Sequence, residues 1–295
     1  MVARLQQLIV FGWLIASTCW IAFWWRSAPA VAIGGLFVLT CAHSAVLAIE
    51  FIASRRVSAS DVRPRATAGH CGKAWWAETR IALQVFCWLQ PFRSGAVPDE
   101  LPSRHRRGVV LIHGFLCNRG FWNPWLHSLR ADERAFVAVN LEPPLGAIDA
   151  FVQTIDEAVE RVASVTGQPP LMICHSMGGL AVRAWLREHD GARVHRIVTL
   201  GTPHAGTWLA RFGHTANGKQ MRIGAEWLSR IDGDHASAHR TAFTCWYSDC
   251  DNVVFPISTA TLPGADNRLA SGRGHVDMAF DPRVRRETLA LLDSD

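Results

Sequence analysis

The sequence has little charge and no organised pattern of cysteines. Only 19% of its 295 residues are charged and 49% are hydrophobic, so the chain can bury one sizeable core and is more hydrophobic than most soluble proteins. Its eight cysteines form no CxxC pair, which argues against a disulfide framework and for small buried side chains in a reducing compartment. Cys245 and Cys250 are near enough in the chain to pair, although nothing requires it. Internal repeats and low-complexity segments are absent as well.

Lysine and arginine are missing from two long apolar runs near the N-terminus. These runs, Leu8 to Trp25 and Val31 to Ile49, are each long enough to cross a bilayer core of about 30 Å as a helix. Only RSAPA, residues 26–30, separates them, so we expect a transmembrane helical hairpin over residues 1–53. A cleaved signal peptide is one alternative, but the first run is long for a signal core and no small-residue cleavage pattern follows it directly. A buried soluble hairpin is another.

Positive charge is concentrated directly after these runs. Residues 54–107 hold ten basic and four acidic residues, whereas residues 108–295 hold eighteen basic and twenty acidic. An excess beside membrane spans suits anionic lipid headgroups and retention on the cytoplasmic side, and it argues against nucleic-acid binding by the folded domain. A solvated basic linker is the plainer alternative. We therefore expect a protein of an inner membrane with its C-terminal domain in the cytoplasm.

Residues 73–92, within this basic linker, have the spacing of an amphipathic helix. Ile81, Val85, Trp88 and Leu89 share one helical face, and Pro91 is expected to end the helix. Such a helix either lies in the membrane interface or packs on the domain that follows.

Residues 108–295 alternate short apolar runs with helical segments. The runs begin at residues 108, 135, 170, 195 and 242 and read GVVLIHG, AFVAVNL, PLMICHS, HRIVTLG and AFTCWYS. Since they are apolar on both faces, they indicate parallel strands covered by helices on both sides of a sheet. This predicts an α/β domain with a mostly helical, lid-like insertion at 205–231 and a C-terminal helix from about residue 282 to 292.

The stretch PLMICHSMGG, residues 170–179, places Ser176 between a buried strand and a helix. A turn this sharp strains the backbone of the serine and lifts its hydroxyl above the sheet, which requires small neighbours. Gly178 and Gly179 meet this need, while Cys174 stands where a glycine is usual. The pattern predicts a nucleophilic serine. The alternative is a plain strand-to-helix turn, since turns of this kind commonly contain glycine.

A nucleophilic serine needs an oxyanion hole. The strand at 108 ends in His113, Gly114 and Phe115, from which the Phe115 N–H can face the developing charge together with the Met177 N–H. Losing one such donor typically costs about 2.7–4 kcal/mol of transition-state stabilisation. Taken alone, HGF is only a tight turn after a strand.

The nucleophile also needs a base and an acid, which follow it in the chain in the order acid, then histidine. Only His275 follows every plausible acid-bearing strand. The segment YSDCDNVVFP offers Asp249 or Asp251 as the acid that orients the histidine. We choose Asp251, because the apolar residues 253–255 would anchor the loop and turn its carboxylate inward. His204 precedes the acid and is expected to pack near the site.

Residues 108–280 resemble the α/β-hydrolase superfamily, and within it the bacterial lipase and esterase branch. Five motifs carry the resemblance in the right order: HGF at 113–115, HSMGG at 175–179 with His175, GTPHAGT at 201–207, DNVV at 251–254 and GH at 274–275. The resemblance implies hydrolysis of carboxylic, lipid-like acyl esters through an acyl-enzyme, without a cofactor. The expectation of a bacterial inner membrane comes from the apolar hairpin and the basic residues beside it, which lie outside the resemblance. Cys174 departs from the pattern, and the lack of room for two early strands suggests a compact, mostly parallel sheet of about six strands.

Several alternatives share these residues. A thioesterase or an amidase would use the same triad, and a catalytically silent hydrolase fold would serve as a membrane-bound binding protein. Asp232 and Asp234, with Asp277, faintly resemble the carboxylates of calcium-binding lipases, but a solvated loop is the better interpretation and we expect no metal. Apolar side chains of the insertion either wall an acyl pocket or belong to the core: Trp208, Leu209, Phe212, Trp227 and Leu228.

Overall fold

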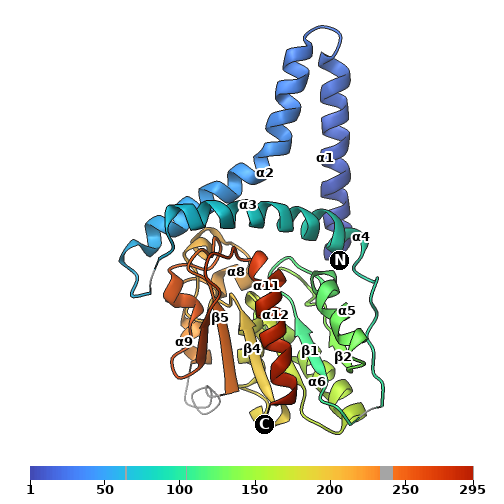
Figure 1. The fold of residues 1–295 in the computed structure, drawn as a ribbon, viewed down its shortest axis with the longest axis vertical. Helices are drawn as coiled ribbons and strands as arrows, with labels where there is room; N and C mark the ends of the chain where they lie inside the picture. Colours follow the sequence, from blue (N-terminus) through green and yellow to red (C-terminus); the bar gives the residue numbers. More distant parts are fainter. Residues whose placement is uncertain (64, 104, 233–241, 295) are drawn as a thin grey trace.

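A computed structural model describes residues 1–63, 65–103, 105–232 and 242–294. Two long N-terminal helices, α1 (Val2–Trp24) and α2 (Pro29–Val57), stand on an α/β domain, and α3 (Ala68–Gln84) lies between them and that domain (Figure 1). The turn between α1 and α2 is the part of the chain farthest from the α/β domain, whereas the N-terminus lies next to that domain (Figure 1).

The helices α1 and α2 are long and apolar enough to cross a membrane, with mean hydropathies of 1.6 and 2.0. Only 6% and 11% of their apolar windows are buried inside the protein, whereas the core helix of a soluble protein is mostly buried. A signal sequence has the same length and composition. Helix α2 continues past the apolar run to Val57 and is followed by a 3₁₀ turn, η1 (Ser58–Ser60).

Helix α3 begins five residues before the expected start, because the Thr67 hydroxyl caps it by accepting the His70 N–H at 3.2 Å. The expected end at Pro91 is also displaced. A π-helical turn, η2 (Val85–Leu89), precedes α4 (Gln90–Phe92), so Pro91 lies inside a helical turn. The π turn rearranges the hydrogen bonds at the point where proline cannot donate one.

The α/β domain contains one six-stranded parallel sheet in the order β2-β1-β3-β4-β5-β6. Five of its strands fall in the predicted runs, and the parallel α/β architecture is confirmed. The sixth, β6, has the sequence DNRL and a partly exposed edge position, so it carries no apolar signal. The strands are β1 (Val109–Ile112), β2 (Phe136–Ala138), β3 (Leu171–His175), β4 (Arg196–Leu200), β5 (Phe243–Tyr247) and β6 (Asp266–Leu269).

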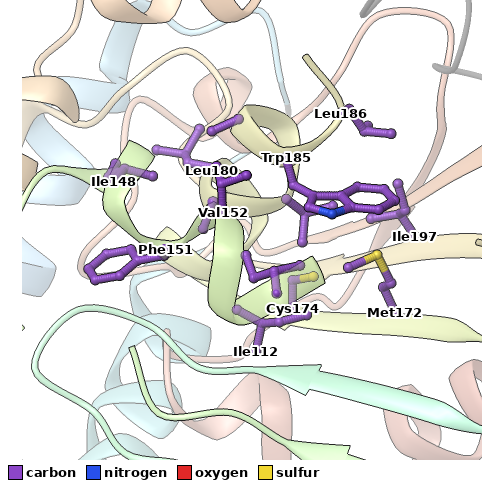
Figure 2. Close-up of a cluster of buried hydrophobic side chains, with 14 of the residues drawn as sticks. Ile112, Ile148, Phe151, Val152, Met172, Cys174, Leu180, Trp185, Leu186 and Ile197 are labelled. Atoms are coloured by element: carbon purple, nitrogen blue, oxygen red, sulfur yellow. The ribbon is translucent and has the colours of Figure 1, made fainter. Parts of the chain in front are cut away.

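Helices cover both faces of the sheet, because alternate strand residues point to opposite sides. One face, with Ile112 and Cys174, packs against α6 (Val152–Thr166), α7 (Met177–Trp185) and α9 (Glu226–Ile231) (Figure 2). The other face packs against α5 (Asn123–Ala131), α11 (Asp277–Phe280) and α12 (Pro282–Leu289). The remaining short elements are η3 (Arg119–Trp122), η4 (Ile148–Phe151), η5 (Gly191–Arg193), η6 (Trp208–Phe212), α8 (Ala216–Gln220), η8 (Ile257–Ala260) and η9 (Ala290–Asp293).

The segment 205–231 contains η6, α8 and α9 and is mostly helical, as expected. Trp227 and Leu228 are buried in the same core cluster as α6 and α7, whereas Phe212 is 63% exposed. The two buried side chains are therefore ordinary core residues.

The cysteine contact differs from the one considered in the sequence. Cys250 Sγ lies 3.2 Å from Cys71 Sγ at the start of α3, and both thiols are free. Cys245 is buried in β5 instead. The contact joins α3 to the loop that carries Asp251.

Candidate active site

The candidate nucleophile Ser176 occupies a strained turn between β3 and α7. Its φ of 54° and ψ of −126° are unusual for a residue with a side chain. The surrounding backbone holds this conformation, since the Ser176 N–H donates to Leu200 O at 2.9 Å and its carbonyl accepts the Thr202 hydroxyl at 2.8 Å. The predicted strain at this serine is therefore present.

Close packing around the turn explains the glycines. A Cβ on Gly114 would lie 2.8 Å from Ser176 Cβ, and one on Gly178 would lie 2.5 Å from Ile112 O. A Cβ on Gly179 would collide with the Thr202 side chain. By contrast, Cys174 points into the core (Figure 2) and is fully buried. A small side chain is therefore accommodated at the position where the family usually has glycine.

The two candidate oxyanion donors lie in adjacent loops, because β1 and β3 are neighbours with Ile112 opposite Cys174. Met177 is the first residue of α7, where an N–H has no acceptor in its own helix. Among the described residues, neither the Met177 N–H nor the Phe115 N–H donates a hydrogen bond. Both are therefore free to bind a developing negative charge.

His113 and His175 support the site as neutral side chains. His113 Nε2 accepts the Leu141 N–H at 3.1 Å, which leaves the proton on Nδ1, 2.9 Å from Gly114 O. Burial lowers the pKa of His113 to about 4. His175 Nε2 lies 3.2 Å from His275 O, and burial together with the charge on His275 holds the pKa of His175 well below its usual value.

Asp251 and His275 form a buried pair, with Asp251 Oδ2 2.9 Å from His275 Nδ1. The other oxygen of Asp251 accepts the N–H groups of Val253 and Val254, both at 2.8 Å. Asp249, the alternative acid, accepts the Ser271 hydroxyl and the Gly272 N–H instead. The geometry thus favours Asp251.

Ser176 and this pair lie at the same edge of the sheet, since β3, β4 and β5 are consecutive parallel neighbours. The His175 and His275 rings are 4.7 Å apart, which links the serine turn to the histidine loop. Within the described part of the chain, no hydrogen bond joins the Ser176 hydroxyl to His275. Such bonds are often long before substrate binds. Gly201 is required here, because a Cβ would lie 3.1 Å from both Asp251 Oδ2 and His275 Nδ1.

Glu78 of α3 is a site residue that the sequence did not reveal. Its side chain is buried, and its two oxygens accept the backbone N–H groups of Val276, at 2.9 Å, and Asp277, at 2.8 Å. These are the two residues that follow His275. A carboxylate from α3 therefore holds the histidine loop.

Helix α2 holds the same pair from another side. Glu50 accepts the Asn252 side-chain N–H at 2.7 Å, and Asn252 Oδ1 accepts the His275 N–H at 3.1 Å. The Ser54 hydroxyl donates to Asp251 O at 2.6 Å. In the sequence, the two glutamates stand out only because no other acidic residue is near them. Glu50 is the one acid in residues 1–60, and Glu78 is the one acid in residues 62–98.

The carboxylates determine the charge state of the histidine. Burial lowers the pKa of His275, but the negative charges of Asp251, Glu78 and Glu50 outweigh this, so the pKa is raised overall. Burial raises the pKa of Glu78 itself to about 7. The site therefore stabilises a protonated His275.

Two of the carboxylates considered as calcium ligands form ion pairs with arginine side chains. Asp232 lies 2.6 Å from Arg183, and Asp277 lies 3.2 Å from Arg273. Asp234 lies outside the described residues.

Comparison with known proteins agrees with the fold. Residues 109–288 match the family model described as the alpha/beta hydrolase family. The chain belongs to this family. Among solved structures, the mature form of lipase BlEst2 from Bacillus licheniformis is similar, with a TM-score of 0.57 and 16% identity over 66% of this chain and 95% of that chain.

The propeptide form of the same lipase has a TM-score of 0.55 and 17% identity over 67% of this chain and 52% of that chain. At this identity the likeness concerns the fold alone. No curated protein matches the chain. The match to the family begins at β1, so α1, α2 and α3 are additions of this hydrolase to the shared domain.

The Glu78→Gln substitution tests how α3 supports the histidine. One acceptor oxygen becomes an NH₂ group, so one of the N–H groups of Val276 and Asp277 loses its partner, and a charge that raises the pKa of His275 disappears. We expect kcat/KM for an ester to fall about tenfold. Since neutral His275 is the base, the acid limb of the pH profile should move to lower pH.

The matched control is Glu160→Gln, whose side chain on α6 is 70% exposed. It should change neither quantity. A Glu78→Gln profile with an unshifted acid limb would contradict the electrostatic role of Glu78.

Proposed function

We propose that this α/β hydrolase is a membrane-anchored serine hydrolase that cleaves carboxylic esters with lipid-like acyl chains. The observation that carries the proposal is the strained turn of Ser176 at the sheet edge where Asp251 and His275 form their buried pair. Backbone strain of this kind is common at active sites, and among the described residues the Ser176 hydroxyl has no hydrogen-bond partner.

In the proposed reaction, Ser176 Oγ attacks the ester carbonyl carbon and His275 Nε2 takes the serine proton. Asp251, bonded to Nδ1, fixes the imidazole tautomer and stabilises the imidazolium. The N–H groups of Phe115 and Met177 bind the oxyanion. When the tetrahedral intermediate collapses, the alcohol leaves with the proton from His275. Water then hydrolyses the acyl-enzyme by the same steps and releases a carboxylic acid.

The exposed apolar surface of α1 and α2 supports membrane anchoring. Leu8, Ile15 and Phe37 are 71%, 63% and 68% exposed, and a bilayer would cover such side chains. Removal as a signal peptide fits less well, because Gln6 and Gln7 of α1 donate hydrogen bonds to Gln90 Oε1, at 3.3 Å, and Pro91 O, at 2.6 Å. The helices are therefore integrated with the rest of the chain.

The Ser176→Ala variant tests the nucleophile. Without the hydroxyl, no acyl-enzyme forms, so we expect ester turnover to fall by about three orders of magnitude or more. A serine-reactive phosphonate should label the wild-type protein and not the variant, while circular dichroism shows that both are folded. Continued labelling of the variant would overturn the assignment.

The acid is tested by two asparagine variants. Asp251→Asn removes the charge that stabilises protonated His275 and should lower kcat by about a thousandfold or more. Asp249→Asn, which disturbs only the turn at residues 271–272, should cost much less. The reverse order of the two variants would assign the acid to Asp249.

Orientation in the membrane follows from the basic residues beside α2. Arg55, Arg56, Arg63 and Arg65 crowd the end of this helix, whereas Arg26 stands alone in the far turn. Basic residues near membrane spans are retained on the cytoplasmic side. We therefore propose a bacterial inner-membrane protein whose two termini both lie in the cytoplasm. A fluorescent protein that folds only in the cytoplasm, fused after residue 295, should fluoresce, and an export-dependent phosphatase at the same site should be inactive.

Cys71 and Cys250 give an independent measurement of the compartment. Their sulfurs are 3.2 Å apart, so an oxidising compartment would join them, whereas in the cytoplasm both should remain thiols. Because both are buried, their state is read by quenching the cells with acid, denaturing the protein and then alkylating it. Active phosphatase together with an oxidised cysteine pair would reverse the proposed orientation.

A further inference from the structure

A large apolar cavity lies between the two candidate membrane helices and α3. Its volume is about 660 Å³, within the range of roughly 300–1,000 Å³ that is usual for ligand sites. Helices α1 and α2 diverge from their connecting turn toward α3, which crosses below them (Figure 1). The walls include Ile9, Leu14, Leu39, Leu83, Phe86 and Leu116.

One wall of this cavity is continuous with the candidate oxyanion turn. Leu116 is the residue after Phe115, and it has a φ of 52°, which is rare for a residue with a branched side chain. Gln6 of α1 also lines the cavity and donates to Leu116 O at 3.3 Å. Gln90 Oε1 accepts both the Gln6 side chain, at 3.3 Å, and the Asn118 N–H, at 2.8 Å. The cavity wall and the turn are thus parts of one hydrogen-bonded unit.

The chemistry of the walls selects the occupant. Apart from Gln6, Thr40 and His43, the lining residues are apolar, so a charged or sugar-like ligand would lose its hydrogen bonds to water without replacement. A hydrocarbon chain has no such cost. The outer faces of α1 and α2 are apolar and exposed, so in a bilayer the surroundings of the cavity are acyl chains.

We propose that this cavity binds the acyl chain of the ester substrate, which enters from the bilayer between α1 and α2, while the ester carbonyl reaches Ser176 past Leu116. The proposal rests on the proposed function and names its substrate class, a long-chain acyl ester drawn from the membrane. It also assigns a role to α1 and α2 beyond anchoring.

Two isoleucines of α1 give a matched test. Ile9 and Ile15 are 62% and 63% exposed, but only Ile9 belongs to the cavity lining. Ile9→Trp fills part of the cavity, whereas Ile15→Trp adds the same bulk on a surface outside it. The full chain, reconstituted in phosphatidylcholine vesicles, is assayed with p-nitrophenyl butyrate and p-nitrophenyl palmitate.

We expect Ile9→Trp to lower the palmitate-to-butyrate ratio of kcat/KM by about tenfold, which corresponds to losing the burial of about two methylene groups. Ile15→Trp should leave the ratio at the wild-type value. An unchanged ratio in Ile9→Trp, or an equal fall in both variants, would overturn the proposal.

A second measurement does not depend on turnover. Ser176→Ala protein in the same vesicles is photolysed with a palmitate ester carrying a diazirine, and the labelled peptides are identified by mass spectrometry. Label on the peptide containing Leu83 and Phe86 should be lost when Ile9→Trp is added and kept when Ile15→Trp is added. If Ile9→Trp removes this label but leaves the kinetic ratio unchanged, the cavity binds acyl chains without contributing to turnover. This result would overturn the substrate role.

Failure of the proposed function has a different signature. A wild-type protein that hydrolyses neither ester and resists the phosphonate would reject the esterase. In that case the photolabel alone decides whether the cavity binds an acyl chain, and an unlabelled α3 would reject the cavity as well.

Discussion

The buried hydrogen bond between Asp251 and His275 is the interaction on which the rest of the site depends. The two residues follow different strands, and neither loop is held by the sheet alone. Glu78 binds the backbone after His275, Asn252 links His275 to Glu50, and the Ser54 hydroxyl binds the carbonyl of Asp251. Three of these four supporting residues, Glu78, Glu50 and Ser54, belong to α2 and α3, which lie outside the segment matched by the family model. These helices are therefore structural components of the site, and removing them would take away the Glu78 contacts of the histidine loop.

The same contacts concentrate negative charge around one imidazole. A buried histidine ordinarily loses its proton more easily, yet three carboxylates reverse this at His275. Glu78, whose pKa is raised to about 7, changes charge near neutral pH. The free energy of unfolding falls as the pH rises from about 4.5 to about 7. In this window the native state still holds the Glu78 proton, whereas the unfolded chain has released it. The hydrogen bonds from Val276 and Asp277 favour the ionised form and limit this cost.

The sequence predicted the shared domain better than the added helices. Five strands were readable, because buried parallel strands are apolar throughout, and the glycines after Ser176 indicated the sharp turn that follows β3. Strand β6 was not located, since an edge strand with polar side chains has no such pattern. Glu50 and Glu78 were missed for a different reason: each is a single acid in an apolar helix, and only the packing of α2 and α3 against loops about 200 residues away gives it a partner.

The position of α3 connects the site to the two long helices. It lies across one end of the α/β domain (Figure 1), and its Glu78 binds the backbone of the two residues that follow His275. The apolar cavity on the other side of α3 reaches Leu116, next to the candidate oxyanion donor Phe115, without crossing that contact. Helix α3 thus supports the histidine loop through Glu78 and lines the apolar cavity through Ala82 and Leu83, so the candidate triad and the proposed acyl site depend on the same helix.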